Sequence, residues 1–408
     1  MSNRKKILLV VFFLVITNVA TFLVSNTIAL KVGKKVMIPV AEYNSMVSTH
    51  VKYSKAMELE NYIKTYFLGD VDEEKMMDGL IKGMFQSLDD PYSVYMNPDE
   101  FKSFTEQNEG VYGGVGIIVT PGDDNLITIV SPIEGTPGER VGLKTGDKIV
   151  KVDGEEFTAD RMDEAVKRMK GEPNTSVTIT ILRTDKEGNK EYIDVEIVRE
   201  EIRLVTVKSD LIEGNIGYIK ITSFDELTYD DFKKHLNQLM DKNISGLILD
   251  LRNNPGGLLD VCVDIADEFL GEAVIVYTET KDGKKQYEYS DRNAINLPLI
   301  VLVNEGSASA SEILAGAIRD HKRGILIGNK TFGKGIVQRI RGLTDGSGFK
   351  LTVSEYFTPN GTSIHGIGIE PDITVELPED VMEIGLENLQ EDTQLQRAIE
   401  EMKEMISK

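Results

Sequence analysis

Cysteine is nearly absent from this sequence of 408 residues. The only one, Cys262, lies in the largely apolar run 261–265. A single cysteine cannot form an intrachain disulfide, so packing must hold the fold together. No His/Asn constellation surrounds Cys262, and we therefore predict a buried structural residue rather than a nucleophile. Hydrophobic residues make up 41% of the chain, which is enough apolar material for sizeable cores without cross-links.

Basic residues are also in deficit, because 46 Lys and Arg face 67 Asp and Glu, for a net charge of -21. Nucleic-acid binding needs a basic surface, so this balance argues against a nucleic-acid partner. The motifs H-E-x-x-H, C-x-x-C and G-x-x-x-x-G-K-[ST] are missing, and we expect no cofactor and no metal. The histidines are scattered, and nothing singles out a Ser-His-Asp triad, although chain order does not exclude one: His50, His235, His321 and His365.

Long hydrophobic runs are lacking except at the N-terminus, where residues 7–24 follow Arg4, Lys5 and Lys6. This run is long enough to span a bilayer, so residues 1–30 are predicted to be a signal anchor or signal peptide. Residues 27–29 form a poor cleavage site, which favours an uncleaved anchor. The positive-inside rule places the remaining chain outside the cytoplasm. An exported chain without disulfides is typical of Gram-positive bacteria, where we expect a secreted or membrane-anchored protein.

The remaining chain divides into regions of different texture. Residues 31–108 are predicted to be a helical arm, and 109–200 a β-rich module with glycine turns, a strand over 148–152 among others, and one amphipathic helix. Strands, the first of them over 216–221, alternate with helices over 201–380, which indicates an α/β core with a substantially parallel sheet. The run GLILDL at 246–251 is typical of a strand buried on both faces. Residues 381–408 are predicted to end in an amphipathic helix.

A serine-rich segment, 304–312, follows an apolar strand and leads directly into a predicted helix. A serine at a strand-to-helix turn exposes its hydroxyl, and the next backbone N–H groups point the same way. Ser309 and the amide of Ala310 would thus supply a nucleophile and an oxyanion donor together. A serine-rich helix N-cap would give the same residues without any chemistry.

A lysine between two glycines marks a second segment, TFGKGIVQ at 331–338. Ile336 and Val337 suggest a strand, so we expect Lys334, Ile336 and Gln338 to share a face. A lysine is a general base only when neutral, which requires burial to lower its pKa. The uncharged Gln338 could orient the amine without holding its proton. The alternative is an ordinary lysine in a glycine turn.

A glycine loop ends the buried strand at 250–257, and loops at the carboxyl ends of parallel strands are where α/β sheets bind ligands. Backbone N–H groups at Gly256 or Gly257 could complete an oxyanion hole. Asp250 and Arg252 are expected to brace this loop by a salt bridge.

Taken together, these segments resemble the carboxyl-terminal processing (tail-specific) serine peptidases, and the bacillar members in particular. The resemblance covers about residues 40–375 and is carried by motifs in the family's order: SLDDPYS at 87–93, GGVG at 113–116, GLKTGDKIVKVDG at 142–154, LDLRNNPGG at 249–257, NEGSASASEI at 304–313, TFGKGIVQ at 331–338 and GIGIEPDI at 366–373. It implies an α/β core of ClpP/crotonase-like fold with an inserted β-rich PDZ domain and helical N- and C-terminal arms.

The family pattern implies a role for each matched residue. Ser309 would be the nucleophile, Lys334 the general base and Gln338 its positioning partner. The amide of Ala310 and a glycine of the 253–257 loop would form the oxyanion hole. The resemblance further implies a serine endopeptidase that cleaves extracytoplasmic proteins for regulation or quality control, with sporulation as the setting suggested by the bacillar members.

The PDZ module is expected to bind an apolar C-terminal tail of the substrate as an added strand. Its peptide-binding residues would be Gly113, Gly114, Val115, Gly116 and Ile117. Cations on its helix could meet the acidic core and hold the module in one of two positions, and Arg168 is the first candidate for this regulatory contact. Solvated surface charges would give the same pattern.

Two other functions stay open at this point, a non-catalytic PDZ adaptor and a small-acyl hydrolase of crotonase-like fold. The intact Ser309, Lys334 and Gln338 argue against the adaptor, and the PDZ loop argues against a small substrate. Apolar stripes on the arm and on the final helix predict a homodimer.

Overall fold

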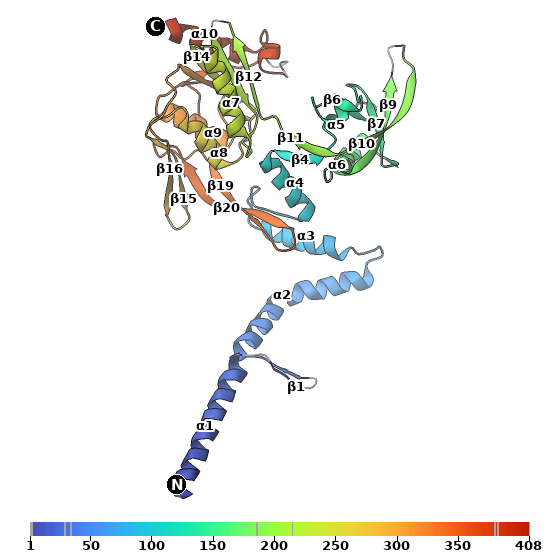
Figure 1. The fold of residues 1–408 in the computed structure, drawn as a ribbon, viewed down its shortest axis with the longest axis vertical. Helices are drawn as coiled ribbons and strands as arrows, with labels where there is room; N and C mark the ends of the chain where they lie inside the picture. The colour runs from blue at the N-terminus through green and yellow to red at the C-terminus, as the bar shows by residue number, and fades with distance from the viewer. Residues whose placement is uncertain are drawn as a thin grey trace. The chain divides into compact units, whose positions relative to one another are not determined.

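A computed structural model describes residues 3–27, 30–32, 35–184, 187–213, 215–378, 381 and 383–407 (Figure 1). The chain divides into two compact units, Met1–Ile81 and Lys82–Lys408. The described part of the first unit consists of long helices and a short antiparallel hairpin, namely α1 (Asn3–Thr27), β1 (Leu30–Val32), β2 (Lys35–Met37) and α2 (Val40–Tyr66). The helix α3 (Glu73–Gln86) runs from the first unit into the second.

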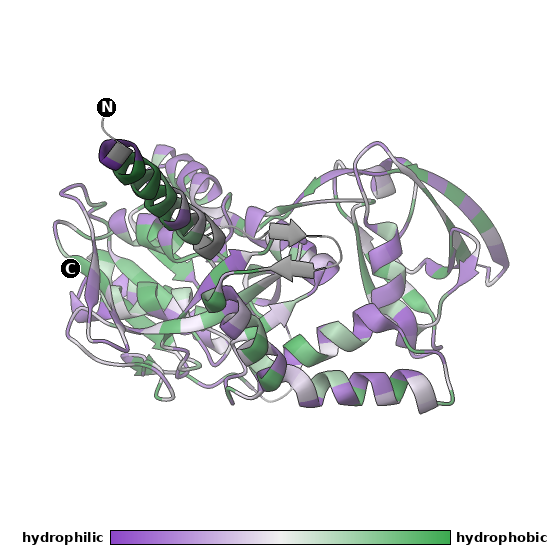
Figure 2. Ribbon diagram, turned by 90° about the horizontal axis from the view of Figure 1, so that it is seen from below, coloured by the Kyte–Doolittle hydropathy of each residue, from purple (hydrophilic) through white to green (hydrophobic). Residues whose placement is uncertain are grey.

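Within α1, residues Arg4–Leu23 form a helix that is long and apolar enough to cross a membrane. Figure 2 shows this helix in the green of hydrophobic residues along most of its length. A signal sequence has the same length and composition, so this helix fits both forms of the prediction for residues 1–30. No residue of α2 is buried.

The second unit continues with β3 (Val94–Met96) and α4 (Pro98–Glu109). Asn97 begins α4 with a capping box, in which its side chain accepts the N–H of Glu100 at 2.9 Å and the Glu100 carboxylate accepts the N–H of Asn97 at 3.0 Å. The reciprocal bonds satisfy amides that the first helical turn leaves open. The predicted arm is therefore helical except for the short strands β1, β2 and β3, which its pattern did not indicate.

The β-rich module contains a sheet of order β10-β9-β7-β6-β5, with β8 paired to β7. The chain enters and leaves the module through a two-stranded ribbon of β4 (Val111–Gly114) and β11 (Glu200–Arg203). The predicted strand 148–152 has the bounds that its pattern gave, and the predicted amphipathic helix is α6, which buries Ala165 and Met169. The elements are β5 (Ile117–Pro121), β6 (Ile127–Pro132), α5 (Pro137–Arg140), β7 (Lys148–Val152), β8 (Glu155–Glu156), η1 (Ala159–Arg161), α6 (Met162–Met169), β9 (Ser176–Thr184) and β10 (Lys190–Val198).

The core sheet has the order β12-β13-β14-β17-β18-β21, and every pairing in it is parallel except β12 with β13. This confirms the predicted α/β core. Its strands are β12 (Val207–Ile212), β13 (Ile216–Ile221), β14 (Gly246–Asp250), β17 (Leu299–Val303), β18 (Ile325–Gly328) and β21 (Ile373–Thr374), and its crossover helices are α7 (Thr228–Asp241), α8 (Leu259–Asp267) and α9 (Ala310–Asp320).

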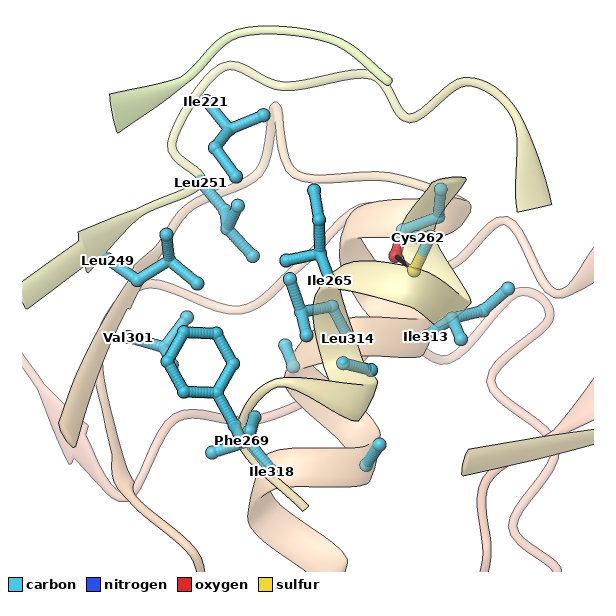
Figure 3. Packing of buried hydrophobic residues seen from close by; sticks show 14 of the residues in the cluster. Ile221, Leu249, Leu251, Cys262, Ile265, Phe269, Val301, Ile313, Leu314 and Ile318 are labelled. Atoms are coloured by element: carbon cyan, nitrogen blue, oxygen red, sulfur yellow. Dashed lines mark hydrogen bonds between the residues drawn. The ribbon is translucent and has the colours of Figure 1, made fainter. Parts of the chain in front are cut away.

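Both faces of this sheet are buried, because alternate residues of a strand point to opposite faces. Leu247 and Leu249 of β14 pack in the cluster with α7, α8 and α9, whereas Ile248 packs in the cluster with α10 (Thr393–Ser407). Figure 3 shows Ile265 of α8 and Leu314 of α9 facing the sheet residues Leu249 and Val301. The continuous apolar run of the buried strand is thus explained by helices on both sides of it.

The C-terminal helix belongs to the core rather than standing apart from it. Its apolar stripe, Leu395, Ala398, Ile399 and Met402, is buried against the sheet, preceded by η2 (Leu386–Asn388). This stripe therefore gives no support to the predicted homodimer, because the chain's own sheet covers it.

A second, antiparallel sheet, of order β16-β15-β20-β19 with β3 on β20, was not predicted. Its strands are β15 (Val274–Thr280), β16 (Lys285–Tyr289), β19 (Ile336–Gly342) and β20 (Gly348–Phe357). This sheet matters for function because the segment 331–335 leads directly into β19.

Candidate active site

Ser309 ends the turn between β17 and α9 and has a backbone conformation of φ 55° and ψ -114°. A non-glycine residue in this region is strained, and such strain persists only where the surroundings enforce it. Gly256 contributes to this enforcement, since a Cβ on it would lie 2.9 Å from the Ser309 Cβ. The Ser309 side chain is partly exposed and lines a cleft.

The neighbouring serines of the motif have structural roles. Ser307 is fully buried and donates its hydroxyl to the carbonyl of Leu251 at 2.8 Å. Ser311 is also buried and donates to the carbonyl of Asn254 at 2.9 Å. Both hydroxyls fasten the 251–254 loop to the serine segment, which leaves Ser309 as the serine of this motif that faces the cleft.

Lys334 lies in the loop before β19, not in the strand, because β19 begins at Ile336. Glycine is required on both sides of Lys334, for two reasons. Gly333 has a φ of 91°, which other residues rarely adopt, and a Cβ on Gly335 would lie 2.5 Å from the amide nitrogen of His365. A bulge between Val337 and Gln338 further interrupts the alternation. The predicted common strand face for Lys334 and Gln338 is therefore wrong.

The buried carboxylate of Glu312 connects the two segments. Its Oε2 accepts the N–H of Ser309 at 2.9 Å and the N–H of Lys334 at 2.8 Å. Its Oε1 accepts the N–H of Gly333 at 2.7 Å and the hydroxyl of Thr331 at 2.5 Å. The sequence analysis gave Glu312 no role. Its position three residues after Ser309, the spacing of a capping box, could have indicated its bond to the Ser309 N–H.

Tyr356 of β20 makes a second connection on the carbonyl side. Its hydroxyl lies 3.0 Å from the carbonyl oxygen of Ser309 and also contacts the carbonyl oxygen of Lys334. Burial raises the pKa of the Tyr356 phenol well above its usual range, so it remains a donor.

Cys262 of α8 is buried, and its thiol donates to the carbonyl of Ala310 at 3.0 Å. This confirms the prediction of a buried, structural cysteine.

The Lys334 ammonium is in surroundings that favour its neutral form. Burial lowers its pKa, and the positive charge of Lys350 lowers it further, while Asp90 and Glu312 act in the opposite direction. The net direction is downward, which is the direction that a lysine base requires.

One cleft of about 230 Å³ brings the predicted residues together. Ser309, Ala310, Lys334, Gln338 and Gly257 all line it. The Gln338 side-chain amide, however, donates to the Ile336 carbonyl at 3.3 Å and to the Thr352 hydroxyl at 3.4 Å. Among the described residues, neither of these bonds involves Lys334. Gln338 is at the site, but its hydrogen bonds brace the β19 bulge.

The two loop glycines differ in what their N–H groups do. The N–H of Gly256 donates to the Asn254 side chain at 2.9 Å. Among the described residues, neither the N–H of Gly257 nor that of Ala310 has an acceptor. A Cβ on Gly257 would lie 2.1 Å from the carbonyl oxygen of Phe224, so only glycine fits there. The open donors at the cleft are thus Ala310 and Gly257.

The predicted peptide-binding segment lies between β4 and β5. Gly113 and Gly114 belong to β4, Val115 and Gly116 are buried in the turn, and Ile117 begins β5. The carbonyls of Val115 and Gly116 accept bonds from Gly138 at 2.7 Å and from Ile133 at 2.9 Å. In the part of the chain that the structure describes, the N–H groups of Val115 and Gly116 have no acceptor, which leaves them open to an anion.

Arg168 lies elsewhere than its predicted role requires. It pairs with Glu155 of its own module at 2.8 Å and stacks on Phe157. The neighbouring Lys167 instead reaches Asp99 of α4 at 2.5 Å. The cation of α6 that contacts a residue outside the module is therefore Lys167.

This fold and these motifs define a class that the comparisons with known proteins identify. Peptidase family S41 matches residues 215–375, the activating protease CtpB N-terminal domain matches residues 14–100, and a PDZ domain matches residues 128–183. The chain belongs to the S41 family of carboxy-terminal-processing proteases, and it is a serine-type peptidase with a PDZ domain.

Among its relatives is a carboxy-terminal-processing protease of Bartonella bacilliformis, 40% identical over 82% of this chain and 77% of the relative. The carboxy-terminal processing protease CtpA of Bacillus subtilis is 40% identical over 80% of this chain and 70% of its own. A solved structure from Bacteroides fragilis, titled as an S41 protease, shares the fold at 18% identity, with a TM-score of 0.52 over 79% of this chain and 90% of that chain.

Proposed function

We propose that this protein is a processing endopeptidase in which Ser309 is the nucleophile and Lys334 the general base. The observation that carries the proposal is the Glu312 carboxylate, which holds the backbone N–H groups of both residues at one cleft. No histidine is among the described residues that line this cleft, whereas the amine of Lys334 is there with a lowered pKa.

In this mechanism the neutral Lys334 amine takes the Ser309 proton as Oγ attacks the peptide carbonyl. The Lys334 ammonium then protonates the leaving amine of the substrate. The neutral Lys334 amine next activates a water molecule, which hydrolyses the acyl-enzyme. The open N–H groups of Ala310 and Gly257 would stabilise the oxyanion of each tetrahedral intermediate. Gln338 would act by holding the β19 bulge beside Lys334.

The substrate would be an extracytoplasmic protein with an exposed apolar C-terminal tail. The tail would add as a strand to β5, with its carboxylate on the open N–H groups of Val115 and Gly116. Ile117 and Val119 of β5 and Val166 of α6 are half-buried and pack against the same apolar cluster, so an added strand along β5 would meet apolar side chains. The N-terminal helix would anchor the protein with its body outside the cytoplasm, in a Gram-positive bacterium.

The division into regions 1–30, 31–108, 109–200, 201–380 and 381–408 is retained as a proposal, with the last region packed on the core. We also keep the expectation that the core is ClpP/crotonase-like, which rests on its run of parallel strands with crossover helices α7, α8 and α9 on one face.

The test is cleavage of a fluorescein-labelled unfolded protein with an apolar tail. Ser309→Ala and Lys334→Ala should each abolish cleavage, because members of a coupled pair fail as a unit. Ser311→Ala is the matched control, since its buried hydroxyl has a structural partner; it should retain activity at reduced stability. Full cleavage by Ser309→Ala would disprove the nucleophile, and loss of activity in His321→Ala with an active Lys334→Ala would point to a histidine base.

A further inference from the structure

The segment SLDDPYS at 87–93 has no part in the mechanism above, yet one of its side chains touches the proposed base. The Lys334 Nζ lies 4.7 Å from the centre of the Tyr92 ring. Tyr92 is half-buried and also lines a separate cavity of about 940 Å³. Tyr92 is thus in contact with the Lys334 amine and with that cavity.

The turn that carries Tyr92 is held by one carboxylate. Asp90 accepts the N–H of Tyr92 at 3.0 Å and the hydroxyl of Ser93 at 2.5 Å. Ser93 in turn accepts the N–H of Thr352 in β20 at 2.9 Å. These bonds fasten the loop to β20, the strand next to β19, and so fix the backbone of Tyr92 relative to the segment that carries Lys334.

The charged groups that face the Lys334 amine come from each element around it. Lys350 of β20 disfavours the ammonium, whereas Asp90 of the loop and the buried Glu312 of α9 favour it. Burial is the largest influence on this amine, and it favours the neutral form. The Tyr92 ring, whose centre lies 4.7 Å from Nζ, supplies part of that burial.

We propose that Tyr92 is a positioning residue for the reaction, whose ring covers the Lys334 amine, keeps bulk water from it and fixes its place beside Ser309. This inference rests on the proposed function, since it assigns Tyr92 a role only if Lys334 is the base. The ring has two effects of opposite sign: its apolar body favours the neutral amine, and the negative face of its π-system favours the ammonium. Because a ring face solvates an ammonium less well than water does, the first effect outweighs the second.

The experiment measures how fast an alkyl fluorophosphonate labels the full-length protein in detergent across a pH series. Labelling forms the Ser309 Oγ–phosphorus bond, releases fluoride and transfers the serine proton to Lys334, and it needs no substrate tail. The wild-type rate should rise about tenfold per pH step of one, up to an apparent pKa below about 10.4.

In Tyr92→Ala, water reaches the amine, so the rising limb should move to higher pH. Labelling at pH 7 should fall about tenfold, and the loss should shrink as the pH rises. Tyr92→Phe keeps the ring and should restore the wild-type limb. Tyr92→Leu keeps an apolar cover without the π-face, so the rising limb of its rate profile should lie at the same pH as in the wild type or at a lower pH. Tyr289→Ala, which removes an exposed ring from β16, is the matched control and should leave the profile unchanged.

The outcomes separate this inference from the proposed function. If Lys334→Ala is inert and the Tyr92→Ala limb superimposes on the wild-type limb, or falls equally at every pH, the covering role of Tyr92 is wrong and the dyad stands. If Lys334→Ala is labelled with the wild-type profile, the proposed dyad itself is wrong. Should Tyr92→Ala not fold, the Leu variant still decides the question, because a rising limb at higher pH than in the wild type would show that an apolar cover does not favour the neutral amine and would contradict the proposal.

Discussion

At the scale of single residues, Glu312 holds the site together. It is fully buried, and each hydrogen bond that its carboxylate accepts comes from Ser309 or from the 331–334 segment. A buried carboxylate of this kind is costly unless its oxygens are satisfied, and here N–H and O–H donors surround both. The strained backbone of Ser309 is therefore fixed by the same group that places Lys334.

Glu312→Gln should separate the two segments, because an NH₂ group would replace an oxygen that faces N–H or O–H donors. We expect kcat to fall by on the order of 100-fold, the effect of a misplacement of about 1 Å in a catalytic pair. Each charge-assisted bond that is lost should also reduce the free energy of unfolding by roughly 1.5–3 kcal/mol. Cleavage kinetics and urea titrations measure the two effects.

Glu305→Gln, an exposed change in the same segment, is the control and should leave both quantities as they are. Wild-type kcat in Glu312→Gln would show that the connection between Ser309 and Lys334 does not depend on this carboxylate.

At the scale of elements, how far the sequence predicts the fold differs between the two sheets. The strands 216–221 and 148–152 have the predicted bounds, because a local pattern of apolar residues was enough to identify them. Strand β20 was missed, and β19 was indicated only by Ile336 and Val337, since both strands mix charged with apolar residues and form by pairing with each other.

The same distance in sequence explains which site residues were found. Ser309 and Lys334 stand in recognisable local motifs. The Tyr356 hydroxyl reaches a carbonyl 47 residues away, and the Glu312 carboxylate reaches amides 21 and 22 residues away. No local spacing predicts such contacts, and the bulge at Gln338 likewise depends on the pairing of β19 with β20.

The turn before β5 gives a prediction for the PDZ module. Gly116 has a φ of 73°, and a Cβ there would lie 2.3 Å from the Thr136 side chain. Gly116→Ala should displace the open N–H groups, so KM for a tailed protein should rise about tenfold while fluorophosphonate labelling of Ser309 stays the same. Gly135 has a φ of 75°, and a Cβ added to it would have no neighbour within 4 Å. Gly135→Ala is therefore the matched control, with the same backbone cost of about 1 kcal/mol but no clash.

Tail-dependent cleavage by the two alanine variants, measured side by side, isolates the effect of the turn. An equal KM in both would mean that this turn does not hold the tail.

The attachment of α10 to the core depends on a buried ion pair. Arg252 is inaccessible to solvent and pairs with Asp250 and Asp392, each at 2.7 Å. Asp392 also accepts the N–H of Leu395 at 2.9 Å at the start of α10. Because Arg252 lies in the loop that leads to Gly256 and Gly257, the end of the chain is coupled to the proposed oxyanion hole.

Asp392→Asn should keep the bond to Leu395 but leave the Arg252 charge only partly compensated. Breaking one side of a buried pair costs roughly 3–5 kcal/mol, so the urea midpoint should fall strongly. Glu400→Gln, which removes an exposed partner of Arg397 on the same helix, should change stability by less than about 0.5 kcal/mol. A midpoint in Asp392→Asn that matches this control would show that Asp250 alone satisfies Arg252.

At the scale of the whole molecule, the apolar stripe of α10 is covered by the core sheet, so it cannot serve as a contact between two subunits. The predicted dimer now rests on the arm, in which no residue of α2 is buried. Leu59, Tyr62, Ile63 and Tyr66 are exposed and follow the i, i+3, i+4, i+7 spacing of one helix face. Exposed apolar stripes of this length mark contact surfaces more often than free ones.

We therefore expect α2 to pair with α2 of a second subunit. Two glutamates in place of Leu59 and Ile63 would bury unpaired charge in such a contact, so residues 31–408 carrying both changes should sediment as a monomer where the unchanged segment sediments as a dimer. Asn61→Glu adds the same kind of charge about 200° around the helix and should leave the dimer intact, because side chains two apart do not share a face. Sedimentation velocity of the three proteins distinguishes a specific face from a general charge effect. If the double variant remains dimeric, the subunits associate through another surface, and if the unchanged segment is monomeric, the stripe on α2 does not serve self-association.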